Sequence, residues 1–276
     1  MTTMTAEQLR IAQTKRLDVN RPADQVLELM RGLVHFDAFT AGKRKKAGCS
    51  IPLAILAAIA AFITSANLNG GKMAVLILGV LFIGAAIAAI VIYGRLRAQD
   101  LSDNLTLTAA PFIALLREDI EPGDPVHVEI DLRPWAIDEK KKKESEPYKK
   151  GAYYKVIDTL YVDPWFSGSA VLADGTKLKW RVVDHMLEKT GTKKNPRGKI
   201  KSKTKVKRKT VAVVTLGFPT KEYAVQDAAD VERDEKRTTM TLARKQKSAG
   251  EEAAVLDLLV DIIADGYRRV KLTRSA

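Results

Sequence analysis

The chain has 276 residues, with 46 lysines and arginines against 33 acidic residues and a formal net charge of +13. This length accommodates a membrane-anchoring segment and one soluble domain of ordinary size. The single cysteine, Cys49, excludes both a disulfide framework and a zinc site built from several cysteines.

Residues 1–46 predict two short helices on the cytoplasmic side. The second is expected to begin at Asn20, a favourable N-cap residue, with Pro22 in its first turn. Its apolar residues Val26, Met30 and Leu33 share one helical face, so the helix either lies in a membrane interface or packs on a soluble domain. Packing is favoured, because the opposite face carries charges of both signs.

Residues 47–94 predict a transmembrane helical hairpin. Its two apolar stretches, Ile51–Asn67 and Met73–Tyr93, contain no charged side chain and are separated by Leu68–Lys72. A helix needs about 20 apolar residues to span a bilayer. The second stretch reaches that length, and the first does so with its small and polar flanking residues. A buried hairpin in a soluble core is the alternative, but the rest of the chain is too strongly charged to cover one.

The distribution of basic residues predicts the orientation of this hairpin. Lys43–Lys46 precede the first stretch and Arg95 and Arg97 follow the second, whereas the connecting loop contributes Lys72 alone. Basic residues near membrane ends favour the cytoplasmic side. We therefore expect an integral protein of the inner or plasma membrane with both termini in the cytoplasm. In architecture alone the chain resembles many bacterial membrane proteins.

Small residues in the second stretch indicate how the hairpin helices pack. Gly84 and Ala88 lie four positions apart and therefore on the same helical face. Small side chains let membrane helices approach closely. We expect this face to pack within the hairpin, with homo-oligomerisation as a second use.

Residues 95–276 predict a cytoplasmic, basic, β-rich domain. The expected elements are helix 111–117, strand 126–132, strands 152–163 and 166–173 broken at Asp163-Pro164, strand 178–182, strand 199–218, strand 238–245 and helix 249–265. Residues 139–150 are expected to be a charged loop, and Asp174-Gly175 predicts a hairpin turn. As one strand, residues 199–218 would reach about 65 Å, so we expect a turn or bulge near Lys207–Thr210. Consecutive strands without alternating helices predict an α+β domain, arranged as an antiparallel sandwich or an open barrel.

The segment 189–209 is rich in lysine and arginine and contains no acidic residue. From Lys199 to Lys209 a lysine occupies every second position, which in a strand places these side chains on one face. The residues expected to bind an anionic surface are Lys193, Lys194, Arg197, Lys199, Lys201, Lys203, Lys205, Lys207, Arg208 and Lys209.

Three interpretations of this segment stay open. The lysines either keep a sheet edge from pairing with other chains, or contact anionic lipids or an acidic protein, or bind nucleic acid. Nucleic acid is disfavoured, because the segment has no aromatic residues for base stacking and more lysine than arginine.

No pattern of catalytic residues is present in the sequence. His35, His127 and His185 are dispersed, and none stands beside other ligand residues at a spacing typical of metal sites. A phosphate-binding glycine loop and a nucleophile elbow are also absent from the sequence. We therefore predict a protein that is not an enzyme and that has no cofactor or metal. Trp165 is expected in the core in preference to a membrane interface.

These observations favour a membrane-anchored interaction or scaffold protein that contacts anionic lipid or an acidic partner. One alternative is an oligomeric membrane effector or pore built from the hairpin. Another is a protein that tethers nucleic acid to the membrane.

Overall fold

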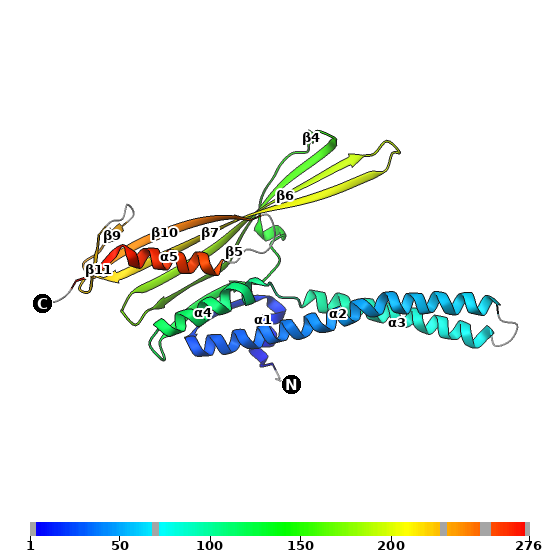
Figure 1. Cartoon of the computed structure of the whole chain (residues 1–276), viewed down its shortest axis with the longest axis horizontal. Coiled ribbons are helices and arrows are strands. Elements are labelled where there is room, and N and C mark those ends of the chain that lie inside the picture. Colours follow the sequence, from blue (N-terminus) through cyan, green and yellow to red (C-terminus); the bar gives the residue numbers. More distant parts are fainter. Residues whose placement is uncertain (1–3, 68–71, 227–230, 249–254, 274–276) are drawn as a thin grey trace. The chain divides into compact units, whose positions relative to one another are not determined.

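The structure is a computed structural model that describes residues 4–67, 72–226, 231–248 and 255–273. The chain forms two compact units (Figure 1). The first combines the N-terminal residues as far as Gln13 with Gly32–Leu101. The second combines Thr14–Arg31 with the residues from Ser102 onward.

The first unit is helical, and its elements are α1 (Ala6–Thr14), most of α2 (Ala23–Asn67) and α3 (Lys72–Ala98). A capping box starts α1, in which the Thr5 amide donates to Gln8 Oε1 at 2.9 Å and the Gln8 amide donates to Thr5 Oγ1 at 3.2 Å. Gln8 also contacts α2 at Gly32, where an added Cβ would lie 1.9 Å from Gln8 Nε2. Glycine at this position therefore lets the two helices approach.

Helix α2 differs from the expectation of a short helix followed by a separate span. Asn20 lies in strand β1 (Arg16–Pro22) and does not cap a helix, and α2 runs unbroken from Ala23 through the basic cluster to Asn67. Lysine, arginine and alanine are strong helix formers, so the segment around Lys43–Lys46 offers no reason to end the helix.

Both α2 and α3 are long and apolar enough to cross a membrane. Their large apolar side chains are exposed, as Leu53 (70 %) and Leu81 (64 %) illustrate. The exposure of these residues argues against a hairpin buried in a soluble core. The loop residues 68–71 lie outside the described residues.

The contact between α2 and α3 uses other small residues than expected. A Cβ added at Gly79 of α3 would lie 3.2 Å from the Phe62 ring of α2, and Ala86 is buried. Gly84 and Ala88 are exposed, and a Cβ added at Gly84 would meet nothing within 4 Å. The expectation that Gly84 and Ala88 pack within the hairpin is therefore wrong. Gly84 lies five positions after Gly79, which turns it about 140° around the helix.

The second unit is built on an antiparallel sheet with the strand order β1-β2-β5-β6-β7-β10-β9, to which β3 and β4 add by pairing with β5. Besides β1 these strands are β2 (Pro125–Asp131), β3 (Lys141–Glu144), β4 (Tyr148–Lys150), β5 (Tyr153–Val171), β6 (Lys177–Lys194), β7 (Ile200–Pro219), β9 (Val231–Arg233) and β10 (Arg237–Ser248). A separate pair is formed by β8 (Tyr223–Val225) and β11 (Val270–Leu272). The antiparallel, β-rich prediction is confirmed, and the described strands do not close into a barrel.

Three differences from the predicted strands have physical causes. Strand β5 continues through Asp163-Pro164, because a bulge at Trp165 absorbs the proline. Strand β7 runs without the turn expected near Lys207–Thr210, since β6 is long enough to pair with it from Lys177 to Lys194. The predicted loop 139–150 contains the short strands β3 and β4, which pair with β5.

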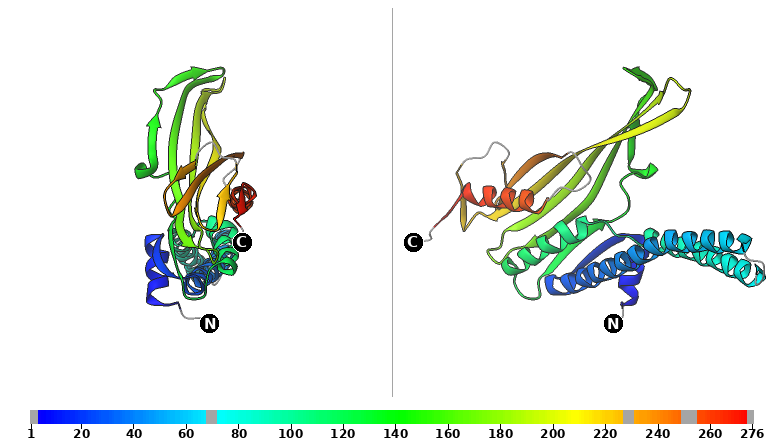
Figure 2. Two further views of the ribbon diagram at one scale, coloured as in Figure 1. Left: turned by 90° about the vertical axis from the view of Figure 1, so that its left-hand side faces the viewer. Right: turned by 45° about the vertical axis from the view of Figure 1, so that its right-hand side comes forward.

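One face of the sheet, here called the covered face, packs against α4 (Ala110–Leu116) and α5 (Leu256–Arg268) (Figures 1 and 2). The Phe112 ring of α4 contacts Trp180 and Phe166 with ring centroids 5.2 and 5.8 Å apart. On α5, a Cβ added at Gly266 would lie 2.2 Å from Leu216, so glycine lets this helix reach the sheet. Trp165 is 1 % exposed and belongs to this core, as expected.

Short helices complete the unit: a π-turn at Leu105–Ala109 before α4, and 3₁₀ turns at Arg117–Asp119 and Asp138–Lys140. The predicted helix 249–265 corresponds to α5, which begins at Leu256 and ends at Arg268. Residues 249–254, at the expected start of that helix, lie outside the described residues.

Candidate functional site

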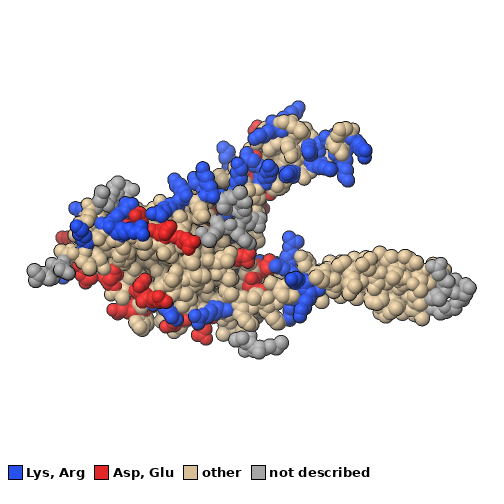
Figure 3. Space-filling model, viewed as in Figure 1, with Lys and Arg blue, Asp and Glu red and all other residues tan. Residues whose placement is uncertain are grey.

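The face of the sheet opposite the covered face carries basic residues on three adjacent strands. We call this set of residues the basic face. Figure 3 shows Lys and Arg side chains gathered along the upper margin of the β-rich domain. Directly opposed residues of an antiparallel pair point to the same side of the sheet. The register of β6, β7 and β10 therefore assigns to the basic face Lys177, Lys179, Arg181, Lys189, Lys193, Lys201, Lys203, Lys205, Lys207, Lys209, Lys245 and Lys247.

The structure brings six of the residues expected from the sequence onto this face. Five lie on β7 and one on β6, and they are Lys201, Lys203, Lys205, Lys207, Lys209 and Lys193. Successive lysines of β7 are about 6.6 Å apart at the usual rise of a strand, and neighbouring strands are about 4.8 Å apart. The lysines thus form a two-dimensional array of positive charge.

The remaining expected residues lie elsewhere. Arg197 and Lys199 are exposed at the turn between β6 and β7, where the Lys199 amide donates to Asn195 Oδ1 at 2.8 Å. Lys194 is exposed, but it pairs with Ile200 and points to the opposite side from Lys193.

Arg208 does not belong to the exposed set, so its prediction as a surface-binding residue is wrong. It is 3 % exposed, on the covered face, and its Nη2 donates to Asp184 Oδ2 at 2.6 Å. Thr210 donates to the other oxygen of Asp184 at 2.6 Å. The even-numbered positions of β7 face the core, so a basic residue at one of them requires a buried acidic partner.

A second buried ion pair lies on the covered face beside Asp184. Asp163 pairs with Asp184 across β5 and β6, and Lys140 Nζ lies 2.8 Å from Asp163 Oδ1. Burial raises the pKa of Asp163 to about 6, although the ammonium of Lys140 opposes the shift. Burial also acts on nearby Asp131, but hydrogen bonds from Arg133 outweigh it and hold the pKa of Asp131 below its usual value. The side chains of Lys140, Asp163 and Asp184 lie inside the domain and are not exposed to partners.

Like charges are directly opposed on the basic face. Lys193 lies across from Lys201, and Lys209 lies across from Lys247. Opposed like charges destabilise a pair of strands. An anion laid across the face would remove this repulsion.

Protection of a sheet edge explains only some of these lysines. In the described part of the chain, β10 pairs with β7 from Arg208 onward, so residues 200–207 have a neighbouring strand on one side. Charged lysine side chains on such an edge keep it from pairing with a strand of another chain. Strand β6, in contrast, pairs with β5 and β7 along its length, and Lys177, Lys179 and Arg181 on it guard no edge.

Acidic and aromatic residues modify the array at one end. Lys189 donates to Asp158 Oδ2, and this hydrogen bond raises the pKa of Lys189. Lys193 Nζ lies 5.8 Å from the centroid of the Tyr153 ring. Tyr148 and Tyr154 are 36 % and 46 % exposed, so two tyrosine rings with their hydroxyl groups are also accessible at this end of the array.

Sequence reasoning missed the full extent of the face. Lys245 and Lys247 lie far from the basic segment in sequence, and only the pairing of β10 with β7 brings them beside it. Lys177, Lys179 and Arg181 were recognisable as the polar side of a strand, but their continuity with Lys201–Lys209 depends on the register of β6 and β7.

Comparison of the chain with models of known protein families, with curated proteins and with solved structures finds no match.

Proposed function

We propose that the chain is an integral membrane protein whose cytoplasmic β-rich domain binds anionic lipid headgroups through the basic face. It acts as an interaction or scaffold protein and not as an enzyme. The single observation that carries the proposal is the register of β6, β7 and β10, which gathers the basic side chains on one side of the sheet.

The anchor in this proposal is the hairpin of α2 and α3. It lies in the inner or plasma membrane, and Lys43–Lys46, Arg95 and Arg97 keep both of its outer ends on the cytoplasmic side. After the hairpin, the chain re-enters the second unit at Ser102, four residues after α3 ends at Ala98. The β-rich domain is therefore held at the membrane surface by a short connection.

The tether changes how much affinity the basic face needs. Each lysine near an anionic leaflet contributes about 1 kcal/mol. A domain attached to the bilayer meets lipid at a high effective concentration, so a few such contacts are enough to hold it against the surface. A mainly lysine face suits lipid headgroups, which require charge but no base-specific hydrogen bonds.

The test uses the full chain in nanodiscs of neutral lipid or of neutral lipid mixed with phosphatidylserine. Cys49 is the sole cysteine, so a Cys49→Ser background lets a dye be placed at Ser202→Cys. Ser202 is exposed and points to the opposite side of the sheet from Lys201 and Lys203. Lipids with a spin-labelled headgroup then quench the dye when the basic face lies on the bilayer.

We expect stronger quenching in the anionic nanodiscs, and we expect it to disappear near 1 M salt, where the Debye length is about 3 Å. Lys201→Glu, Lys203→Glu and Lys205→Glu together should abolish the difference between the two lipids. The matched control reverses the exposed residues Lys221, Arg233 and Lys236, which changes the net charge equally away from the basic face.

Equal quenching in both lipids, or equal loss in the control, would overturn the proposal. The basic face would then serve a soluble polyanion, such as an acidic protein or a nucleic acid.

A further inference from the structure

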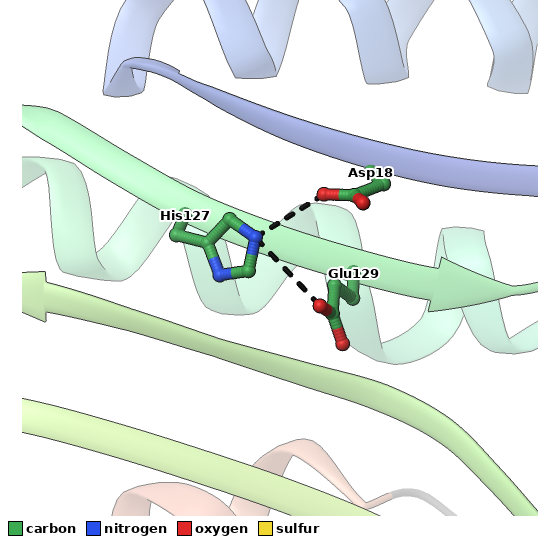
Figure 4. A group of neighbouring side chains, drawn as sticks. All are labelled: Asp18, His127 and Glu129. Atoms are coloured by element: carbon green, nitrogen blue, oxygen red, sulfur yellow. Dashed lines mark hydrogen bonds and ion pairs between the residues drawn. The ribbon is translucent and has the colours of Figure 1, made fainter.

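Strands β1 and β2 bring an aspartate, a histidine and a glutamate together at one end of the sheet (Figure 4). Asp18 of β1 lies directly opposite Glu129 of β2, and His127 precedes Glu129 by two positions on the same face. The sequence predicts no metal site here, because 109 positions separate Asp18 from His127. Only the pairing of β1 with β2 reveals the group.

The ligand atoms of the three side chains converge. His127 Nε2 lies 3.1 Å from Asp18 Oδ1 and 3.7 Å from Glu129 Oε1. All three ligand atoms lie within 4.8 Å of one another. Ligands bound to one metal ion at 2.0–2.2 Å are themselves about 3 to 3.5 Å apart. Small side-chain rotations therefore suffice to close the group around an ion, and the exposure of Asp18 and Glu129 and the partial exposure of His127 permit them.

A histidine alone does not satisfy both carboxylates. Neutral imidazole carries one proton, so Nε2 donates one hydrogen bond at most. Two carboxylates aimed at one nitrogen repel each other unless a cation lies between them. An ion coordinated by Nε2 and one oxygen from each carboxylate satisfies all three groups.

A further contact orients Glu129. Ser167 Oγ of β5 donates to Glu129 Oε2 at 2.9 Å, which leaves Oε1 directed toward His127. A hydrogen bond to the outer oxygen of a ligating carboxylate is typical of the second layer around a metal ion. His127, Glu129 and Ser167 also line a hollow of about 500 Å³ that extends toward Lys179 and Arg181. The hollow leaves room for water or an anionic group on the ion.

We propose that Asp18, His127 and Glu129 bind a divalent transition-metal ion such as Zn²⁺ through one nitrogen and two oxygens. Imidazole and carboxylate ligands suit ions of this class. The three ligands lie on the same side of the sheet as the basic face, but none of them is one of its lysines or arginines. The metal proposal therefore does not rest on lipid binding.

The test measures binding of Zn²⁺ alone to the full chain in detergent by isothermal titration calorimetry. The protein carries Cys49→Ser and no polyhistidine tag, so that neither contributes ligands. We expect one equivalent of Zn²⁺ to bind. His127→Ala and Glu129→Gln should each weaken binding at least tenfold, and Ser167→Ala about tenfold, as expected for a residue that positions a ligand.

His185→Ala is the matched control, because His185 is also a strand histidine of intermediate exposure on the same side of the sheet, opposite Lys209. It should leave the affinity unchanged. Glu129→Gln conserves the size of the side chain, and its amide oxygen can still accept the hydrogen bond from Ser167. If the variant melts at the same temperature as the wild type, its weaker Zn²⁺ binding is due to the lost carboxylate charge. Absence of stoichiometric binding, or equal effects of His127→Ala and His185→Ala, would overturn the proposal.

Discussion

The two halves of the long hairpin β6–β7 have the same alternating pattern but different surroundings. In the half nearest the β5–β6 turn, even-numbered residues such as Trp180 and Leu216 are buried beneath helices. In the far half, the even-numbered residues Thr190 and Thr204 share a hydroxyl hydrogen bond of 3.0 Å at the surface. The odd-numbered side is basic in both halves. Alternation thus specifies a strand, whereas the identity of the residues on one side decides whether that side is covered.

The change between the halves occurs at the buried pair of Asp184 and Arg208. On one side of it the even-numbered residues are apolar, and on the other, beyond Met186, they include Glu188, Thr190, Thr192, Ser202 and Thr204. A buried charged pair does not necessarily add stability. Its position suggests instead that it marks where the core ends, and three predictions test this comparison.

The largest effect is expected from Arg208→Ala, which leaves Asp184 buried without its cationic partner. Removing one member of a buried ion pair costs about 3 to 5 kcal/mol of unfolding free energy. Lys207→Ala, on the exposed face next to it, should change stability by less than about 0.5 kcal/mol. Denaturant unfolding of the full chain in detergent measures both. Equal losses for the two variants would contradict the distinction between the faces.

An intermediate effect on the unfolding free energy is expected from the ionisation of Asp163, which lies beside Asp184. An unfolded aspartate ionises near pH 4, whereas the folded pKa of Asp163 is about 6. Between these values the folded chain holds a proton that the unfolded chain has lost, so the contribution of Asp163 to stability falls as pH rises from 4 to 6. At neutral pH the ionised, buried carboxylate costs roughly 1 to 3 kcal/mol.

The measurement compares the unfolding free energy of the wild type with that of Asp163→Asn across pH 4 to 7. The difference between them should move in favour of the variant as pH rises. A constant difference over this range would show that Asp163 has no raised pKa. Comparison with the variant cancels the carboxylates that are distant from Asp163. Asp131 shares Lys140 with Asp163, and its lowered pKa acts in the opposite direction.

The smallest effect is expected in the far half, from Lys201→Thr. Lys201 is directly opposed to Lys193, so its removal relieves about 0.2 to 1 kcal/mol of repulsion at low salt. Amide exchange in residues 190–204 should slow by up to about fivefold. Lys203→Thr is the control, because Lys203 lies opposite Gly191 and no charge. If both variants slow exchange equally, the cause is the higher strand propensity of threonine and not the relief of repulsion between Lys201 and Lys193.

Much of the second unit was predictable because its strands alternate or end in recognisable turns. The Asp174-Gly175 turn is present, with Gly175 at a positive φ of 77°. Strand β1 was not recognised, because Asn20 and Pro22 look like the start of a helix when read without β2 beside them. The lysine alternation was visible, but the burial of Arg208 depends on helices packed against the other face of β7.

The Asp18, His127 and Glu129 group illustrates the same limit. Its members lie in segments that are distant in sequence and adjacent in the sheet. Local patterns identify strands well, and they say little about which strands become neighbours.

The bulge at Trp165 determines which side chains of β5 point to the covered face beyond it, because one extra residue in a strand exchanges its two faces. Asp163 and Phe166 are three residues apart, yet both lie on the covered face, because Trp165 is the extra residue between them. Loss of one residue later in β5 would invert every side chain beyond it, turning Ala170 outward. Loss of Trp165 itself would leave that parity intact, at the cost of a large buried ring. The bulge is thus a place where β5 can change length by one residue without exchanging its two faces.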